Sequence, residues 1–255
     1  MSDVAGGDPP AVPGSERPGS VVIVAPMRSE LRPVVKALAA RPTTVGEVEA
    51  HRGRTGRREV VIGLIGVGPE AARRATERLL DALAAQDTAV AQVVVSGIAG
   101  GIAEDIAVGD TVVPDRVLDL ASGRSFEASP VPGRRNARTI ATVDELILDL
   151  DRLAAMAADG IDALDMETAA VAAAAGARDI PWTAVRVISD RPRDGLLDDG
   201  IMAMLRPDGS VDPVAALRHV ATHPGRLPKL ARLGRDASAA AARAARTAVA
   251  VASSL

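Results

Sequence analysis

Two short, mainly apolar runs that end in acidic residues constrain this chain more than any other feature. Residues 161–164 are followed by Asp165 and Glu167, and residues 183–188 are followed by Asp190. Runs of this length and composition are typical of buried strands. In a parallel sheet, ligands bind at the carboxyl ends of the strands. We therefore expect both runs to bring an acid to the same edge of one sheet.

The interior of the protein has to be built almost without aromatic rings. Phe126 and Trp182 are the only Phe, Tyr or Trp residues in 255, although 47% of the chain is hydrophobic. Val, Ile, Leu and Ala must then fill the core, as they do in parallel sheets covered by Ala-rich helices. The expected fold class is α/β, with a mixed, mainly parallel central sheet and helices on both faces.

The order of predicted elements supports this class. Strands are expected at residues 21–24, 48–54, 59–65, 93–95, 108–114, 139–143, 161–164 and 183–188. Helices are expected from Ser29, as the cap, to about Ala40, then at 69–85, at 144–157 and after Glu167. Residues 121–138 are rich in Ser, Gly, Pro and Arg, and predict a long loop.

The ends of the chain differ in composition from its middle. Residues 1–19 are rich in Gly, Pro, Ser and Asp and predict a disordered tail, so residues 20–255 are expected to form a single domain. Asp212 is expected to cap a helix from Pro213, and Gly225 and Pro228 to separate it from a last helix that ends near Val251.

This C-terminal part, at about 213–251, is basic. It carries seven basic residues and one acid, Asp236. A solvated helical face explains the charge, and contact with an anionic membrane surface is the alternative. Nucleic acid is not expected as a partner, because aromatic side chains that stack on bases are lacking.

Several classes of protein are excluded by what the sequence lacks. Without cysteine there are no disulfides, and three histidines without an HExxH pattern predict no metal site. No run of 18 apolar residues predicts a membrane span, and the N-terminus does not resemble a signal peptide. A cytoplasmic protein without a cofactor is therefore expected.

Two glycine-rich turns are candidates for ligand binding. Residues 66–69 (Gly-Val-Gly-Pro) lead into a predicted helix, whose free N–H groups can hold an anion. Residues 96–101 (Ser-Gly-Ile-Ala-Gly-Gly) follow an apolar strand, where glycine lets a ligand approach the backbone closely.

Three segments together resemble one enzyme family. They are residues 25–30 (Ala-Pro-Met-Arg-Ser-Glu), residues 96–101 with the Val-Gly-Asp at 108–110, and Asp165-Met-Glu167 with residues 185–190. Their order and spacing are similar to those of the purine nucleoside phosphorylases and nucleosidases, and most similar to the methylthioadenosine/S-adenosylhomocysteine nucleosidase branch. Residues 205–212 and 224–228 instead resemble the hopanoid-associated phosphorylase subgroup, which is linked to removal of adenine from adenosylhopane.

The resemblance implies catalytic roles for two acids. Asp190 matches the general acid that protonates or hydrogen-bonds N7 of the purine, and Glu30 matches the base that activates water in the hydrolytic branch. Breaking an N-glycosidic bond builds positive charge on the sugar and negative charge on the purine, so a proton donor at the base is needed. An aspartate donates a proton only if burial raises its pKa.

The resemblance also implies a nucleoside-binding set. Glu167 matches the carboxylate that binds the ribose hydroxyls, with Met166 under the sugar and Arg186 on the neighbouring strand. Gly100 lines the nucleoside site, and Ile147 lies near the base. Inorganic phosphate is the alternative to water as the attacking group, and the family forms homo-oligomers.

Two departures from the family pattern affect the expected substrate. Ile98 replaces a hydroxyl residue, and Leu146 stands where an aromatic ring that stacks on the base is common. These changes predict a more apolar pocket and favour a bulky apolar group on the ribose. The leading hypothesis is an enzyme that cleaves the N-glycosidic bond of an adenosine-type nucleoside, such as adenosylhopane, and releases adenine. The alternatives are a methylthioadenosine/S-adenosylhomocysteine nucleosidase and a non-catalytic nucleoside-binding module. A membrane-surface protein built on the basic C-terminal helices is a third hypothesis, which is compatible with the first.

Overall fold

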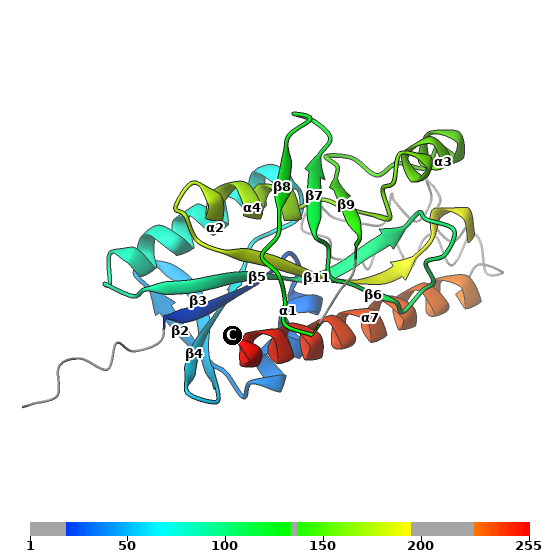
Figure 1. Cartoon of the computed structure of the whole chain (residues 1–255). Coiled ribbons are helices and arrows are strands. Elements are labelled where there is room, and N and C mark those ends of the chain that lie inside the picture. Colours follow the sequence, from blue (N-terminus) through cyan, green and yellow to red (C-terminus); the bar gives the residue numbers. More distant parts are fainter. Residues whose placement is uncertain (1–18, 134–136, 195–226) are drawn as a thin grey trace, which may run out of the picture.

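The computed structural model describes residues 19–133, 137–194 and 227–255. A central sheet runs in the order β2-β3-β4-β1-β5-β10-β9-β7-β8, and β11 and β6 lie on the other side of β5. Helices α1 and α7 cover one face, and α2 and α4 cover the other (Figure 1). The predicted class, a mixed and mainly parallel sheet with helices on both faces, is confirmed.

The strands follow the apolar runs closely in most places. Their bounds are β1 Ser20–Ala25, β2 Arg41–Val45, β3 Val48–Thr55, β4 Arg58–Leu64, β5 Val90–Gly101, β6 Thr111–Val112, β7 Arg116–Asp119, β8 Ser125–Glu127, β9 Thr139–Thr142, β10 Ala163–Asp165 and β11 Trp182–Asp190. Every strand predicted at a long apolar run is present. Two further strands were not predicted: the edge strand β2 is polar, and β7 has only two apolar residues, Val117 and Leu118.

The helices are α1 Arg28–Ala37, α2 Pro69–Ala84, α3 Leu150–Ala158, α4 Thr168–Gly176 and α7 Leu227–Ser254, with a short 3₁₀ turn at Pro192–Asp194. The prediction of a helix start at Pro69 is confirmed. The predicted helix from Pro213 lies outside the described residues. Pro228 was expected to precede the last helix, but it lies in the first turn of α7, where proline is tolerated.

Three local predictions are wrong. Met27, and not Ser29, caps α1, because the Glu30 carboxylate accepts the Met27 N–H at 2.9 Å. Helix α3 begins at Leu150, because the side chain of Asp149 accepts the amides of the first turn. The loop expected at 121–138 contains β8, which pairs with β7 as an antiparallel hairpin.

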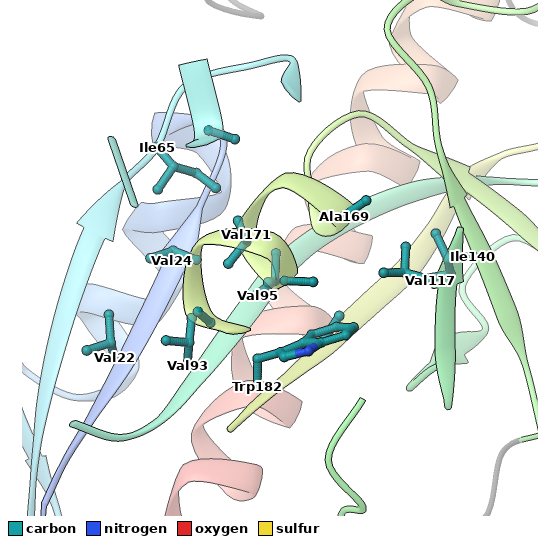
Figure 2. Close-up of a cluster of buried hydrophobic side chains, with 14 of the residues drawn as sticks. Val22, Val24, Ile65, Val93, Val95, Val117, Ile140, Ala169, Val171 and Trp182 are labelled. Atoms are coloured by element: carbon teal, nitrogen blue, oxygen red, sulfur yellow. The ribbon is translucent and has the colours of Figure 1, made fainter. Parts of the chain in front are cut away.

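The core is aliphatic, as the shortage of aromatic residues requires. On the α2/α4 side, Val93 and Val95 of β5 pack with Val171 of α4, and Trp182 fills the space toward β7 (Figure 2). On the other side, Ala240, Ala244 and Ala248 of α7 belong to one cluster with Val94 of β5 and Val185 of β11, the two strands on which α7 packs. Small alanine side chains allow the helix to lie close to the sheet. The valines on both faces of the sheet are therefore shielded from water.

The two acid-bearing strands reach the same place for a reason other than the one we expected. β11 runs parallel to β5, but β10 runs antiparallel to it. Gly100 near the end of β5 pairs with Leu164 of β10 on one side and with Asp190 of β11 on the other. The two acidic segments therefore meet because both strands pair with β5. They do not lie at the carboxyl ends of two parallel strands, as we had expected.

Candidate active site

The guanidinium of Arg186 forms the centre of a buried charged cluster. Arg186 lies on β11 and is fully buried. Its Nε is 2.9 Å from Oδ2 of Asp165, its NH2 is 3.2 Å from Oε2 of Glu167, and its NH1 donates to the Ile98 carbonyl at 3.4 Å. A buried cation requires such partners, because an unpaired charge in the interior is costly.

Asp165 orders the cluster through its hydrogen bonds. Its Oδ1 accepts the hydroxyl of Thr142 at 2.7 Å and the backbone amides of Glu167 and Thr168 at 3.2 Å. The hydroxyl of Thr168 also bonds Asp165 and lies 3.1 Å from NH2 of Arg186. These contacts join β9, β10, α4 and β11. Asp165 therefore holds Arg186 and the backbone of Glu167 in place.

Glu30 reaches the cluster from the N-terminus of α1. Its Oε2 accepts the amide of Met27 and its Oε1 accepts the amide of Ile98, both at 2.9 Å. Burial raises the pKa of Glu30, while Arg186 and the two amides oppose the rise. Because both oxygens accept backbone N–H groups, the carboxylate is fixed in one orientation between α1 and β5.

Glu167 is held from two directions. Its Oε1 accepts the amide of Gly68 at 3.0 Å, and its Oε2 faces Arg186. The turn at 66–69 therefore binds an acidic group through a backbone N–H, as its sequence allows, and this group is the Glu167 carboxyl. Burial raises the pKa of Glu167 to about 7, against the opposing effect of Arg186.

Asp190 differs from the other acids in being partly exposed at the end of β11. Burial still raises its pKa, although the Ser189 hydroxyl donates to Oδ1 at 2.6 Å and lowers it. A Cβ atom on Gly100 would lie 3.7 Å from Oδ2 of Asp190. The glycine thus leaves bare backbone beside a carboxyl group whose pKa is raised by burial.

The charges in the cluster do not balance. Glu30, Asp165 and Glu167 surround the single cation Arg186, and the Coulombic influence of Arg186 on both glutamates is smaller than that of burial. Like charges at short range disfavour full ionisation. The cluster therefore retains a proton more readily than three independent carboxyl groups would.

Gly97 belongs to the site, although the sequence did not predict it as a site residue. A Cβ atom built there would collide with NH1 of Arg186 and lie 2.7 Å from Oε1 of Glu30. Only the absence of a side chain lets these two groups meet above β5. The glycine stood in the motif at 96–101, but nothing in the sequence showed what it faces.

The remaining candidate residues lie at different distances from the acids. The backbone of Ile98 contacts both Glu30 and Arg186, and its side chain packs toward the α7 side of the sheet. Met166 packs on a separate apolar cluster that contains Ile147. The structure therefore unites Glu30, Glu167 and Arg186, while Ile147 is buried between β9 and α3.

A cavity of about 600 Å³ opens beside α3. It is lined by residues of α3, by residues 101–105, and by Pro192 and Arg193. It adjoins Gly101, the neighbour of Gly100, but the carboxyl groups described above do not line it. Among the residues that the structure describes, no cluster of three or more potential metal ligands is found. Within the same ranges, no helix is long and apolar enough to cross a membrane.

The fold and this cluster define an α/β protein whose candidate active site is made of buried carboxyl groups around one arginine. The family model of the phosphorylase superfamily matches residues 20–152 and 135–203. The chain belongs to the phosphorylase superfamily, and the prediction of an enzyme of this kind is confirmed.

Solved structures of similar fold support the same architecture. A 5′-methylthioadenosine/S-adenosylhomocysteine nucleosidase of Helicobacter pylori is 17% identical with a TM-score of 0.68, covering 94% of this chain and all of that one. The corresponding nucleosidase of Neisseria meningitidis, in complex with methylthio-immucillin-A, is 17% identical with a TM-score of 0.66, covering 93% and 100%.

Futalosine hydrolase of Helicobacter pylori is also 17% identical, with a TM-score of 0.64, covering 91% of this chain and 97% of that one. A search of curated protein sequences gave no match. Identities this low show a shared fold, and the substrate has to be argued from the site itself.

Proposed function

We propose that this protein cleaves the N-glycosidic bond of an adenosine-type nucleoside and releases adenine. The observation that carries the proposal is the position of Gly100, which pairs with both acid-bearing strands. It sets the partly exposed Asp190 on one side of β5 and the segment of Glu167 on the other. The similar nucleosidases and futalosine hydrolase support a nucleoside as the substrate.

The chemistry assigns a different task to each acid. As the bond from C1′ to N9 breaks, its electron pair moves onto the purine, and Asp190 donates a proton or a hydrogen bond to N7. The raised pKa of Asp190 suits a donor. Glu167, held by Gly68 and Arg186, faces the ribose and accepts its hydroxyl hydrogens. Its negative charge stabilises the cationic sugar of the transition state.

Water is the attacking group that the charges favour. Three carboxyl groups surround Arg186, so a phosphate ion would meet net negative charge and no unpaired cation in the cluster. Glu30 accepts a proton from the water as its oxygen attacks C1′. One water molecule is consumed: its oxygen becomes the hydroxyl group on C1′, the products are adenine and the free sugar, and no phosphate is needed.

The substituent on the ribose is proposed to be bulky and apolar, as in adenosylhopane. Ile98 places an aliphatic side chain in the motif that holds Glu30, and Leu146 is an apolar side chain that is 38% exposed. The similarity to the hopanoid-associated subgroup also supports a bulky apolar substituent. The segments of this chain that carry the similarity, residues 205–212 and most of 224–228, lie outside the described ranges. Methylthioadenosine is the second candidate, because nucleosidases of that specificity share the fold.

Adenine release from purified protein tests the proposal. Adenosylhopane, methylthioadenosine, S-adenosylhomocysteine and adenosine are incubated in parallel, each with and without inorganic phosphate, and free adenine is measured by chromatography. We expect adenine from at least one nucleoside at a rate that phosphate does not change. A strict phosphate requirement would replace water by phosphate. Tight adenine binding without turnover of any nucleoside would make the protein a binding module.

A further inference from the structure

One layer of the molecule presents a strongly basic surface, which we call the basic face. It consists of the exposed side chains of Arg28, Arg32 and Lys36 on α1 and of Arg232, Arg235, Arg243 and Arg246 on α7. Helices α1 and α7 pack on the same side of the sheet (Figure 1). Leu31 and Val34 of α1 belong to one apolar cluster with the alanines of α7. Their outward sides therefore face the same way.

The spacing of these residues makes two stripes. Arg28, Arg32 and Lys36 are four residues apart, which places them on one side of α1. On α7, steps of three, eight and three residues keep all four arginines within one narrow sector, over about 21 Å of helix. The buried residues Ala240, Ala244 and Ala248 occupy the opposite side of α7.

Little negative charge accompanies the basic face. Within the described ranges of the two helices, Asp236 is the exposed-side acid, and it pairs with Arg232 at 3.5 Å. Glu30, the other acid of α1, points into the core and is 2% exposed. Outside the helices, Asp110 is exposed next to Gly109, whose carbonyl accepts a hydrogen bond from Arg243.

Helix α2, on the other face of the sheet, does not share this excess of basic residues. On α2, Arg73 pairs with Glu70 and Glu77, Arg74 pairs with Glu70, and Asp81 pairs with Arg178. Acids and bases on that helix are equal in number: Glu70, Glu77 and Asp81 against Arg73, Arg74 and Arg78. Helix α2 is therefore neutral, and of these two layers of the described structure only the one made by α1 and α7 carries an excess of positive charge.

We propose that the basic face docks the protein on an anionic lipid bilayer. A broad surface of two side-by-side helices matches a planar array of headgroup phosphates, and each basic residue near such a surface adds to the attraction. Single-stranded nucleic acid is disfavoured, because neither helix carries an aromatic side chain for stacking on bases. The exposed residues between Arg235 and Arg243 are small, such as Ser238 and Ala239, so the attraction is electrostatic.

Vesicle co-sedimentation of the full chain tests this docking. Vesicles of phosphatidylcholine alone are compared with vesicles that also contain about a third phosphatidylglycerol. We expect sedimentation only with the anionic vesicles, and release when salt is raised to about 0.5 M. The triple variant Arg32→Glu, Arg235→Glu and Arg246→Glu should lose at least about 100-fold in partition coefficient.

The control variant reverses Arg74, Arg78 and Arg124, which are exposed away from the basic face, and has the same net charge as the test variant. It should sediment like the parent protein. Equal loss in both variants, no sedimentation at low salt, or equal affinity for a single-stranded oligonucleotide would overturn the proposal. Adenine release from a water-soluble nucleoside is measured on the same samples, so failure of docking and failure of catalysis are distinguished.

Discussion

The backbone amide of Gly68 lies 3.0 Å from Oε1 of Glu167 and donates a hydrogen bond to it, across 99 residues of sequence. The contact joins the N-terminus of α2 to the acid at the start of α4. Oε2 of the same carboxylate faces Arg186, so both of its oxygens are occupied within the protein. Glu167 is thus oriented before any ligand arrives, which lowers the entropic cost of binding a ribose.

Glu167→Gln should weaken the dependence of stability on pH. The Glu167 carboxyl has a pKa near 4.5 when unfolded and of about 7 when folded. Between these values the folded state holds a proton that the unfolded state has released, which favours folding. This stabilisation is present at acidic pH and is lost as the pH rises through about 7.

Urea denaturation at pH 5 and pH 8 measures the effect. The parent protein should lose unfolding free energy between the two, and the Gln variant should lose up to about 3 kcal/mol less. Glu77→Gln, on the surface of α2, is the matched control and should follow the parent. An unchanged pH dependence in the Glu167 variant would show that this carboxyl is ionised throughout.

Apolar patterning predicted the layers of this fold because buried strands and their turns are local features. The apolar pattern predicted strand β5 and the acids at the ends of β10 and β11. The antiparallel direction of β10 was not predicted, because strand direction depends on pairing across more than 60 residues. The polar edge strand β2 carries no apolar alternation, so no pattern marks it.

The site could be predicted only as far as its motifs reach. Glu30, Glu167 and Asp190 stood in recognisable segments, and the structure positions the first two around Arg186. The contribution of Thr142, which binds both Asp165 and the amide of Ala169, comes from pairing of β9 with β10 and has no local signal. Residues that position other residues are specified by packing and are hidden from a single sequence.

Asp190→Asn should reduce adenine release at least about 100-fold, because an amide can donate a hydrogen bond to the purine but cannot transfer a proton to it. The measurement is kcat for the best nucleoside substrate, with near-ultraviolet circular dichroism to confirm the fold. Since Asp190 is partly exposed at a strand end, the substitution should change stability little. Full activity in the Asn variant would remove Asp190 from the proposed mechanism.

Ser189→Ala should move the alkaline limb of activity to higher pH. The Ser189 hydroxyl donates a hydrogen bond to Oδ1 of Asp190 and lowers the pKa of this carboxyl. Without it the carboxylate form is less stable, so the pKa of Asp190 rises further. Activity that depends on protonated Asp190 is present at low pH and is lost as the pH rises through that pKa.

The pH profile of kcat/KM tests this shift. Ser20→Ala removes a hydroxyl that bonds Glu59, far from the site in the sheet, and should leave the limb in place. A shift to lower pH after Ser189→Ala would mean that a group other than Asp190 controls the limb.

Gly97→Ala should destabilise the protein by about 3 kcal/mol or more, because the added methyl group would meet both Arg186 and Glu30. The neighbouring backbone of β5 is paired with β11 on one side, so the strand cannot move away to make room.

Gly176→Ala is the matched control: it lies at the end of α4 with open space around it, and the same change there should be neutral or slightly stabilising. Thermal unfolding of both variants gives the comparison, and soluble yield serves as the readout if the Gly97 variant does not fold. A melting temperature equal to that of the parent in Gly97→Ala would mean that the arginine and the glutamate are not held together above this glycine, and the water-activating role proposed for Glu30 would then lose its structural support.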